Sequence, residues 1–311
     1  MRYIITLIGA SLFATPTAAE VPRVVTDIGP VHSLVAQVMG DLGEPQLLLE
    51  RGADPHSFQL RPSQAADVAE AQLVVWIGPE MTPWLERALD SLSADVPQLP
   101  LLGANGSMTL AYAEGDDHDH DHAHEEAGIE EDADSHSGTD PHAWLDPGNA
   151  AVWLDLIAAD LARIDPANAV TYVANAKTAI SAVQTLDRDL QAQLAAIQSR
   201  PFVVFHDAYR YFTGHYGLNV AGTLAFGDAA APGAERLSEL RSRMESGDAL
   251  CIFPEAAHDP KQVALMAEGT DVRIGQALEP EGSTLTPGPA LYDTLMRGLA
   301  QTLTDCLTAA G

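Results

Sequence analysis

Residues 166–198 read PANAVTYVANAKTAISAVQTLDRDLQAQLAAIQ, and this stretch decides the fold. After Pro166 it contains neither glycine nor proline, and apolar residues such as Val173, Ile180 and Leu190 recur at helical spacing. At 1.5 Å per residue, a helix of this length runs for about 45 Å, which is enough to extend along two lobes. The stretch therefore predicts one rigid helix that joins two halves of the chain.

Both halves alternate short β-branched runs with helical patterns. In the first half, 23–26 precedes 31–39, and in the second, 202–206 precedes 207–216. Such alternation is typical of βαβ units with a parallel sheet. We predict an α/β fold of two lobes, each a parallel β-sheet flanked by helices. The predicted divisions are a signal peptide (1–19), an N-terminal lobe (20–163), the linking helix (164–198) and a C-terminal lobe (199–311).

The first 19 residues have the features of a secretory signal peptide. One arginine precedes an apolar run at 4–13, and small residues follow at Thr17, Ala18 and Ala19. The alternative, a membrane anchor, requires about 20 apolar residues, and Pro16 cuts this run short. The sequence therefore predicts export with cleavage after Ala19.

The charge and the cysteines limit the classes of partner and of site. A formal net charge of −28 would repel phosphate backbones and anionic lipid, so nucleic acid is excluded as a partner; solubility is the ordinary reason for such acidity. The two cysteines, Cys251 and Cys306, are predicted to form a disulfide in an oxidising compartment. A thiolate metal site would instead need them free.

Residues 113–137 are rich in aspartate, glutamate and histidine and lack the apolar residues that offset ordering entropy. We predict a disordered loop. It is interpreted either as a solvated linker or as a low-affinity metal collector, and the run DDHDHDHAH at 116–124 favours the collector. Its candidate ligands are His118, His120, His122, His124 and His136.

Three other histidines occur where a strand or loop ends and a helix begins: His56, His142 and His206. The first two share an Asp-Pro-His context, and the third follows the run 202–205. Any one of them alone would be read as a hydrogen-bonded loop histidine. Because they come from both halves, they can converge only in a cleft between the lobes, and three imidazoles with one oxygen form the tetrahedral shell that Zn2+ prefers.

The mature chain resembles the cluster of metal-binding proteins that serve ABC importers, and is most similar to ZnuA-type zinc-binding proteins. The matching stretches, in the expected order, are RGADPHSF (51–58), LRPS (60–63), VVWIGPEM (74–81), DPHAWLDP (140–147), FHDAYRYF (205–212) and PGAE (232–235). The resemblance implies two parallel-sheet lobes, a rigid linking helix, a cleft metal site, a His-rich loop and a disulfide in the second lobe. It further implies a periplasmic monomer that docks on an inner-membrane permease, with a periplasmic zinc chaperone as a further candidate partner.

The resemblance also bears on the metal and on the fourth ligand. His206 stands where manganese binders of this cluster have a carboxylate, which favours zinc over the alternative of a manganese-binding relative. The cluster has an Asp in a Leu-Asp-Pro turn, and this chain has Leu278, Glu279 and Pro280 there. Glu279 is therefore the predicted fourth ligand, while water in its place, with Glu279 a solvated turn residue, is the alternative.

The remaining polar candidates receive supporting or ordinary roles. Asp146, Asp207 and Arg210 are predicted to orient the ligand imidazoles. Glu255 and His258 are interpreted as an exposed polar helix face. Two histidines in helical stretches are predicted to be packed or surface residues: His32 and His215.

Two other functional classes are alternatives to metal delivery. A zinc hydrolase with three histidine ligands would need a general base and a substrate pocket, and the chain has no His-Glu-x-x-His helix, nucleophile elbow or glycine-rich phosphate loop. A metal-dependent adhesin built on the same fold is the non-enzyme alternative. The sequence thus predicts a zinc-binding protein without catalytic activity.

Overall fold

The computed structural model describes residues 21–56, 58–92, 96–112, 138–225, 233–256 and 258–309. The predicted signal peptide and the predicted disordered loop at 113–137 lie outside the described residues. So do the five loop histidines, His118, His120, His122, His124 and His136. These predictions therefore have no structural counterpart here.

The N-terminal lobe is built on a parallel sheet with the strand order β2-β1-β3-β4. Its strands are β1 (Val24–Thr26), β2 (Gln46–Leu47), β3 (Leu73–Trp76) and β4 (Gln98–Pro100), and its helices are α1 (Gly29–Met39), α2 (Pro62–Ala69) and α3 (Pro83–Asp90). β1 and β3 are buried along their whole length, because helices cover both faces of a parallel sheet. Their residues are apolar except for Thr26, whose hydroxyl donates to the carbonyl of Gln46 at 3.2 Å.

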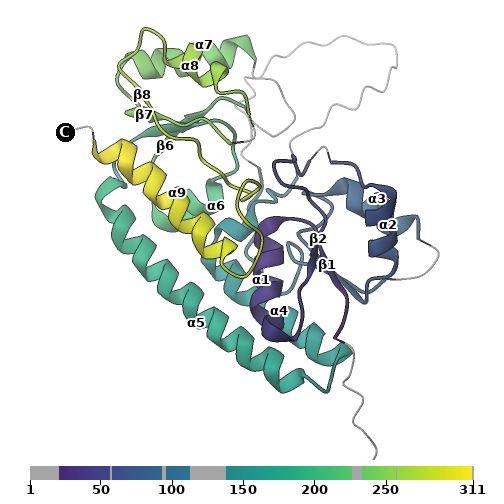
Figure 1. Cartoon of the computed structure of the whole chain (residues 1–311). Helices are drawn as coiled ribbons and strands as arrows, with labels where there is room; N and C mark the ends of the chain where they lie inside the picture. The colour runs from purple at the N-terminus through teal and green to yellow at the C-terminus, as the bar shows by residue number, and fades with distance from the viewer. Residues whose placement is uncertain are drawn as a thin grey trace, which may run out of the picture.

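The C-terminal lobe repeats this plan with the order β6-β5-β7-β8, again parallel. Its strands are β5 (Phe202–Val204), β6 (Val220–Thr223), β7 (Cys251–Ile252) and β8 (Arg273–Ile274), and its helices are α6 (Arg210–Tyr216), α7 (Ala234–Glu245) and α8 (Lys261–Ala267). The two lobes stand side by side in Figure 1, and the predicted fold class is confirmed.

Long helices run along one side of both lobes (Figure 1): α4 (Pro147–Ile164), α5 (Ala169–Leu194) and α9 (Leu291–Thr308). α5 packs against α1, α4 and α9. Its buried positions include Tyr172, Val183 and Leu190, whereas Val173 is 41% exposed. The buried stripe begins at Tyr172 rather than Val173, since adjacent residues on a helix face different directions.

A single hydrophobic core connects the lobes. It contains Val24 of β1 and Val75 of β3 together with Phe202 of β5 and Phe253 just beyond β7. Helices α1 and α9 are also joined by a hydrogen bond, in which the hydroxyl oxygen of Ser33 accepts from the backbone N–H of Tyr292 at 3.0 Å. Moving one lobe far from the other would open this core, so the fold limits hinge motion.

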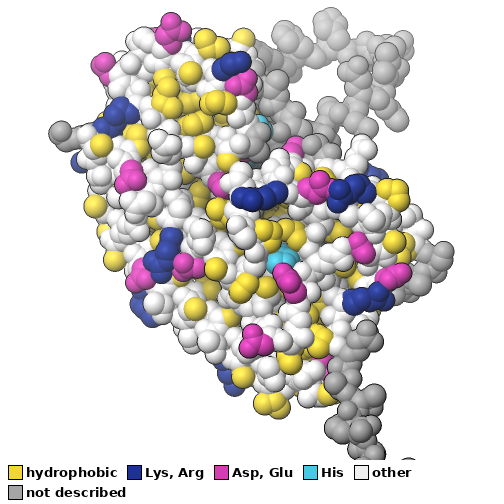
Figure 2. Space-filling view, viewed as in Figure 1, with side chains coloured by type: hydrophobic (Ala, Val, Ile, Leu, Met, Phe, Trp, Pro, Cys, Tyr) yellow, Lys and Arg dark blue, Asp and Glu magenta, His cyan; other side chains and the backbone are white. Residues whose placement is uncertain are grey.

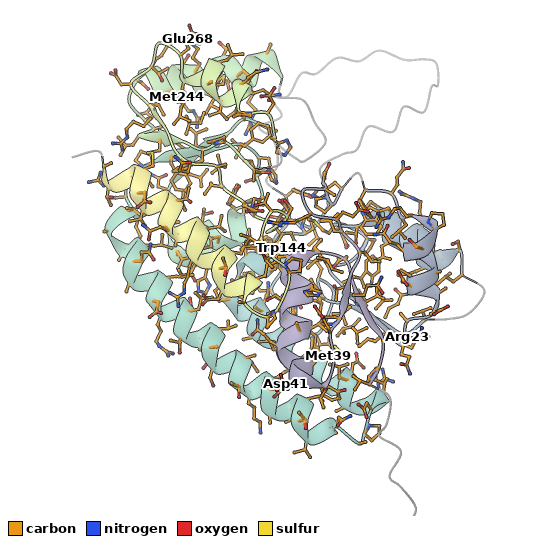
Figure 3. All side chains as sticks on the ribbon, viewed as in Figure 1. Arg23, Met39, Asp41, Trp144, Met244 and Glu268 are labelled. Carbon is orange, nitrogen blue, oxygen red and sulfur yellow. A yellow bond between two sulfur atoms is a disulfide. The ribbon has the colours of Figure 1, made fainter. Side chains whose placement is uncertain are left out.

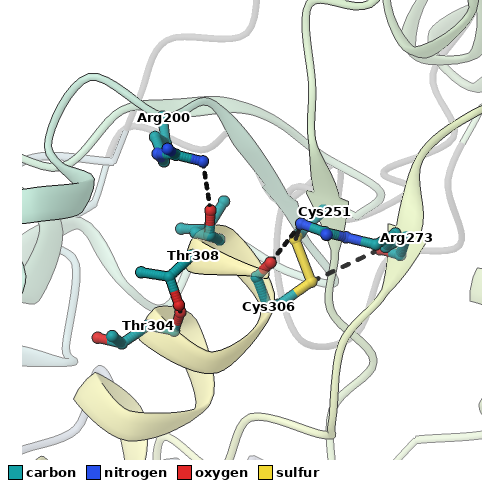
Figure 4. Close-up of a disulfide and its surroundings, with 7 residues drawn as sticks. Arg200, Cys251, Arg273, Thr304, Cys306 and Thr308 are labelled. Carbon is teal, nitrogen blue, oxygen red and sulfur yellow. Dashed lines mark hydrogen bonds between the residues drawn. A yellow bond between two sulfur atoms is a disulfide. The ribbon is translucent and has the colours of Figure 1, made fainter. Parts of the chain in front are cut away.

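The disulfide between Cys251 and Cys306 ties β7 to α9 (Figure 4) and confirms the predicted pairing. Arg273 of β8 donates to the carbonyl of Cys306, and Arg200 donates to the carbonyl of Leu307 at 2.7 Å. The last helix is therefore fixed to the C-terminal lobe by one covalent bond and two arginine contacts.

Among the described residues, no helix combines the length and the apolar character needed to cross a membrane. On the face seen in Figure 2, acidic and basic side chains are interspersed rather than gathered into patches of one sign. That distribution is typical of a surface that favours solubility.

Candidate metal centre

His56 lies in the loop that follows β2. Its backbone N–H donates to Oδ1 of Asp54 at 2.8 Å, a local turn that places the imidazole. The loop is anchored from outside as well, since the indole N–H of Trp84 donates to the carbonyl of Pro55 at 2.6 Å and the ring of Phe58 meets Trp84 edge-on. The first ligand candidate is thus held by its own loop and by α3.

His142 has a closely related support. Oδ1 of Asp140 accepts from the backbone N–H of His142 at 3.0 Å and also bonds its ring Nδ1 at 2.8 Å. Both side chains are essentially inaccessible, at 0% and 1% exposed. Tyr211 of α6 donates to the carbonyl of Asp140 at 2.9 Å, so the C-terminal lobe helps to hold this turn.

His206 follows β5 and is supported from a neighbouring strand. Its Nδ1 bonds Oε2 of Glu255 at 2.6 Å, and the hydroxyl of Tyr209 donates to the same oxygen at 3.0 Å. Glu255 follows β7, which pairs with β5, so the two side chains meet at the carboxyl edge of the sheet. A carboxylate on Nδ1 fixes the tautomer that presents Nε2 to a metal.

The three histidines converge where the lobes meet. The ring centroids of His56 and His142 are 6.0 Å apart, and those of His142 and His206 are 5.4 Å apart. Ligand atoms of His142, His206 and Glu281 all lie within 4.8 Å of one another, and all three residues are buried. His56 stands beside this group, next to His142, rather than within it.

The carboxylate in this group is Glu281, not the predicted Glu279. Both carboxylate oxygens of Glu279 accept hydrogen bonds from Thr284, one from its backbone N–H and one from its hydroxyl at 2.8 Å. That turn holds the Glu279 side chain against its own segment, whereas Glu281 is 6% exposed and faces the histidines. Among the described residues, the carboxylate grouped with the histidines is thus Glu281, and the ligand role of Glu279 stays a prediction.

The segment that carries Glu281 is bonded to both ligand loops of the N-terminal lobe. Trp144, at the junction of the lobes in Figure 3, donates to the carbonyl of Pro280 at 2.8 Å. Gly52 donates its backbone N–H to the carbonyl of Ser283 at 3.0 Å. Glu281 is therefore positioned between one contact to the His142 loop and one to the His56 loop.

Glu255 is a buried ionised carboxylate beside His206. Its burial opposes ionisation, but the attraction and hydrogen bond of His206, and then those of His258, outweigh burial and hold the pKa of Glu255 well below its usual range. The hydrogen bond to Glu255 in turn raises the pKa of His258, with a smaller contribution from the charge of Glu281. The site therefore keeps an ionised carboxylate behind His206.

The residues predicted to orient the imidazoles have other partners. Asp146 accepts from the backbone of Gly148 at 2.6 Å as the N-cap of α4 and also bonds His215. Asp207 lies 3.9 Å from Arg210, and burial raises its pKa to about 6. The carboxylates that bond the ring Nδ1 atoms are instead Asp140 and Glu255.

The interpretation of Glu255 and His258 as an exposed polar face is wrong, because Glu255 is 3% exposed and bonds His206. The signal available in the sequence was the position of Glu255 just beyond the buried run of β7, at the same edge as His206. His32 was predicted to be either packed or on the surface, and it is packed, with its ring bonded to the carbonyl of Pro45 at 3.0 Å.

Comparison with known proteins connects this geometry to a family. The family described as "Zinc-uptake complex component A periplasmic" matches residues 24–306. The high-affinity zinc uptake system protein ZnuA of Paracoccus denitrificans (strain Pd 1222) is 52% identical over 309 residues, 95% of each chain. The protein of the same description from Brucella suis biovar 1 (strain 1330) is 34% identical over 320 residues, 96% of each chain.

The likeness extends to solved structures. The SBP FpvC from Pseudomonas aeruginosa, in complex with Mn2+, superposes with a TM-score of 0.76 at 21% identity, covering 94% of this chain and 100% of that chain. At that identity the likeness supports the two-lobed fold and not the choice of metal.

Proposed function

Because the chain belongs to the family of periplasmic zinc-uptake component A proteins, we propose that it captures a zinc ion in its cleft and delivers it to an ABC importer. The ligands in this proposal are His56, His142, His206 and Glu281. The observation that carries it is the convergence of three histidines from separate elements of two lobes beside one buried carboxylate.

The donor set favours zinc among divalent ions. Three imidazole nitrogens and one carboxylate oxygen form the four-coordinate shell that Zn2+ adopts, whereas Mn2+ prefers more oxygen ligands. The carboxylates behind His142 and His206 hold each ring with Nδ1 turned outward, which directs Nε2 to the ion. The site therefore needs little reorganisation to accept zinc.

Capture in this proposal involves closure of the ligand shell and no covalent chemistry. His142, His206 and Glu281 supply three of the four ligands, and His56, whose ring centroid lies 6.0 Å from that of His142, completes the shell by a small adjustment of its loop. The shared hydrophobic core limits how far the lobes open, so release depends on the loops and on the 278–285 segment. A permease that pulls on that segment would separate Glu281 from the histidines.

The setting of this function is the periplasm. Residues 1–19 act as the signal peptide, and the mature monomer docks on an inner-membrane permease; a periplasmic zinc chaperone is a candidate upstream donor. The names of the relatives support the periplasmic uptake system, and the pattern of residues 1–19 supports export.

The test is zinc binding by the mature chain. Native mass spectrometry of protein purified without added metal, before and after chelation, gives the stoichiometry, and a competition titration gives the affinity. We expect one tight zinc per chain and at least a tenfold loss of affinity in each of H56A, H142A and H206A, because each ligand also positions the others.

A matched pair tests the fourth ligand. We expect E281Q to weaken the tight site clearly, while E279Q changes the affinity by less than threefold, because Glu279 bonds Thr284. Unchanged affinity in all three histidine variants would refute the cleft site. A loss in E279Q with none in E281Q would return the fourth position to Glu279.

A further inference from the structure

The carboxylate of Glu255 uses its two oxygens differently. Oε2 accepts from Tyr209 and bonds His206 at 2.6 Å, while Oε1 lies 3.3 Å from Nε2 of His258. Ligand atoms of His206, Glu255 and His258 all lie within 4.8 Å of one another. A second group with metal-ligand chemistry thus shares His206 with the cleft site.

Both contacts are hydrogen bonds, but only the longer one also has the separation expected of two ligands on a single zinc ion. The 2.6 Å contact is a short, charge-assisted hydrogen bond. Ligands about 2.0–2.2 Å from a tetrahedral zinc ion are themselves about 3.3–3.5 Å apart, which matches the 3.3 Å between Oε1 of Glu255 and Nε2 of His258.

We propose that Glu255 and His258 form an outer zinc position, completed by water, at which an incoming ion binds before it moves to the cleft. This inference rests on the proposed function and extends it with a route for the ion. It leaves Oε2 of Glu255 on His206, so the imidazole keeps its orientation while the outer position is occupied.

Exposure fits the direction of transfer. The side chain of His258 is 30% exposed, whereas those of Glu255 and His206 are 2% and 1% exposed. His258 is nonetheless held in place, because its ring stacks on Phe205 with centroids 4.3 Å apart and planes 26° apart. The outer position therefore has one ligand that solvent reaches and one that is fixed at the edge of the cleft.

The path from the outer position to the cleft is short and lined by ligands. The ring centroids of His258 and His206 are 6.1 Å apart, and those of His206 and His142 are 5.4 Å apart. Glu281 belongs to the cleft group, which shares His206 with the outer position's ligand pair. A cation that moves inward thus leaves one carboxylate as it approaches another.

The outer position should be the weaker of the two. It offers only two protein ligands, and each water that completes the shell exchanges readily, whereas the cleft offers four protein groups. Weak binding at the rim suits a transit site, because an ion held tightly there would not move on.

The experiment measures the rate of zinc capture by the full chain with Zn2+ alone, using stopped flow with a chromophoric chelator, in the wild type, H258A and H258Q. The amide introduced in H258Q can still donate a hydrogen bond to Glu255, but it is a poor zinc ligand. We expect capture to slow at least fivefold in both variants, with the equilibrium affinity of the tight site changed by less than threefold. Release must then slow in proportion, because the ratio of the two rates is the affinity.

The control is H215Q, which removes a histidine of similar exposure that pairs with carboxylates away from the cluster. It should capture zinc at the wild-type rate. Wild-type capture by H258Q would show that His258 only supports Glu255 by a hydrogen bond, and would overturn the outer position. Absence of a tight zinc in the wild type would instead overturn the proposed function, so the two failures are distinguishable.

Discussion

The two lobes hold their ligand histidines in different ways. In the N-terminal lobe, His56 and His142 are each bonded by an aspartate two residues upstream, Asp54 and Asp140. In the C-terminal lobe, the partner of His206 is Glu255, 49 residues downstream in the segment that follows β7. One lobe encodes the support of its ligands in local turns, and the other encodes it in the assembly of its sheet.

This difference has a physical consequence. An Asp-Pro-His turn keeps its geometry as long as its own loop is folded, because its hydrogen bonds span only a few residues. The contact between His206 and Glu255 requires that β5 and β7 remain paired, and β7 is fixed to α9 by Cys251 and Cys306. The C-terminal half of the site should therefore be more sensitive to changes far from the ligands.

The largest expected effect concerns the disulfide. Replacing both cysteines, C251S with C306S, should lower the free energy of unfolding by about 3 to 5 kcal/mol, because the bond closes a loop with a sequence separation of 55. Denaturant unfolding of the wild type and the double variant measures this loss. Thiol titration of the unfolded, unreduced wild type should find no reactive thiol; two thiols would contradict the bond.

The second prediction compares the two supports directly. E255Q and D140N each replace a carboxylate with an amide of the same shape. Each variant should lower the zinc affinity of the tight site by about 10- to 100-fold, since groups that orient metal-bound imidazoles have effects of this size. We expect the larger loss in E255Q, because Glu255 also bonds Tyr209, whose ring lies beside that of His206. Competition titration against a chelator measures both, with E279Q as a control; a greater loss in D140N would reverse the comparison.

The difference between local and long-range support also explains which site residues could be predicted from the sequence. The Asp-Pro-His context of His56 and His142 is visible within three residues, and the placement of His206 after a buried run indicated the third histidine. The alternation of buried runs and helices predicted both parallel sheets, although it did not predict β4, whose run of Gln98, Leu99 and Pro100 is not distinctively apolar.

Two differences between the sequence prediction and the structure concern contacts that spacing does not encode. Glu279 and Glu281 flank one proline, and only the folded turn shows that Thr284 bonds the first while the second faces the histidines. Glu255 was assigned to an exposed helix because a glutamate three residues before a histidine fits a helical face. Its burial depends on the pairing of β7 with β5, which lies outside any local pattern.

The third prediction concerns a further electrostatic link between the lobes. His215 of α6 bonds Asp146, the N-cap of α4, at 3.3 Å and Asp187 of α5 at 2.9 Å. The hydrogen bond with Asp146, assisted by Asp187, raises the pKa of His215 to about 9 even though burial opposes the charge. His215 therefore holds its proton more tightly in the folded chain than in the unfolded chain.

The sign of the pH dependence follows from that shift. A raised pKa in the folded state gives stability that is fully present below pH 6.5 and is lost as the pH rises toward about 9. After allowance for partial solvent screening, the loss should be about 1 to 2 kcal/mol. Denaturant unfolding of the wild type and of H215Q at pH 6 and at pH 9 measures this loss of free energy. If the free energy of unfolding falls equally in the two chains between these pH values, His215 is not the cause.

The smallest expected effect on the tight site is that of the His-rich loop, residues 116–136, which lies outside the described residues. Alternating histidine and aspartate supply nitrogen and oxygen ligands at high local density. The sequence predicts a disordered loop, and a disordered chain loses conformational entropy when it wraps an ion. In the cleft, that entropy has already been lost on folding, because turns hold His56 and His142 and the C-terminal sheet holds His206. We therefore expect excision of 116–136 to change the affinity of the tight site by less than threefold, to remove additional weak sites, and to slow capture only when zinc is scarce or held by a competitor. Calorimetry on the intact and shortened chains separates the two interpretations. Identical stoichiometry at high zinc would make the loop a linker, whereas loss of the tight site would mean that the ligands in the two lobes are not sufficient on their own.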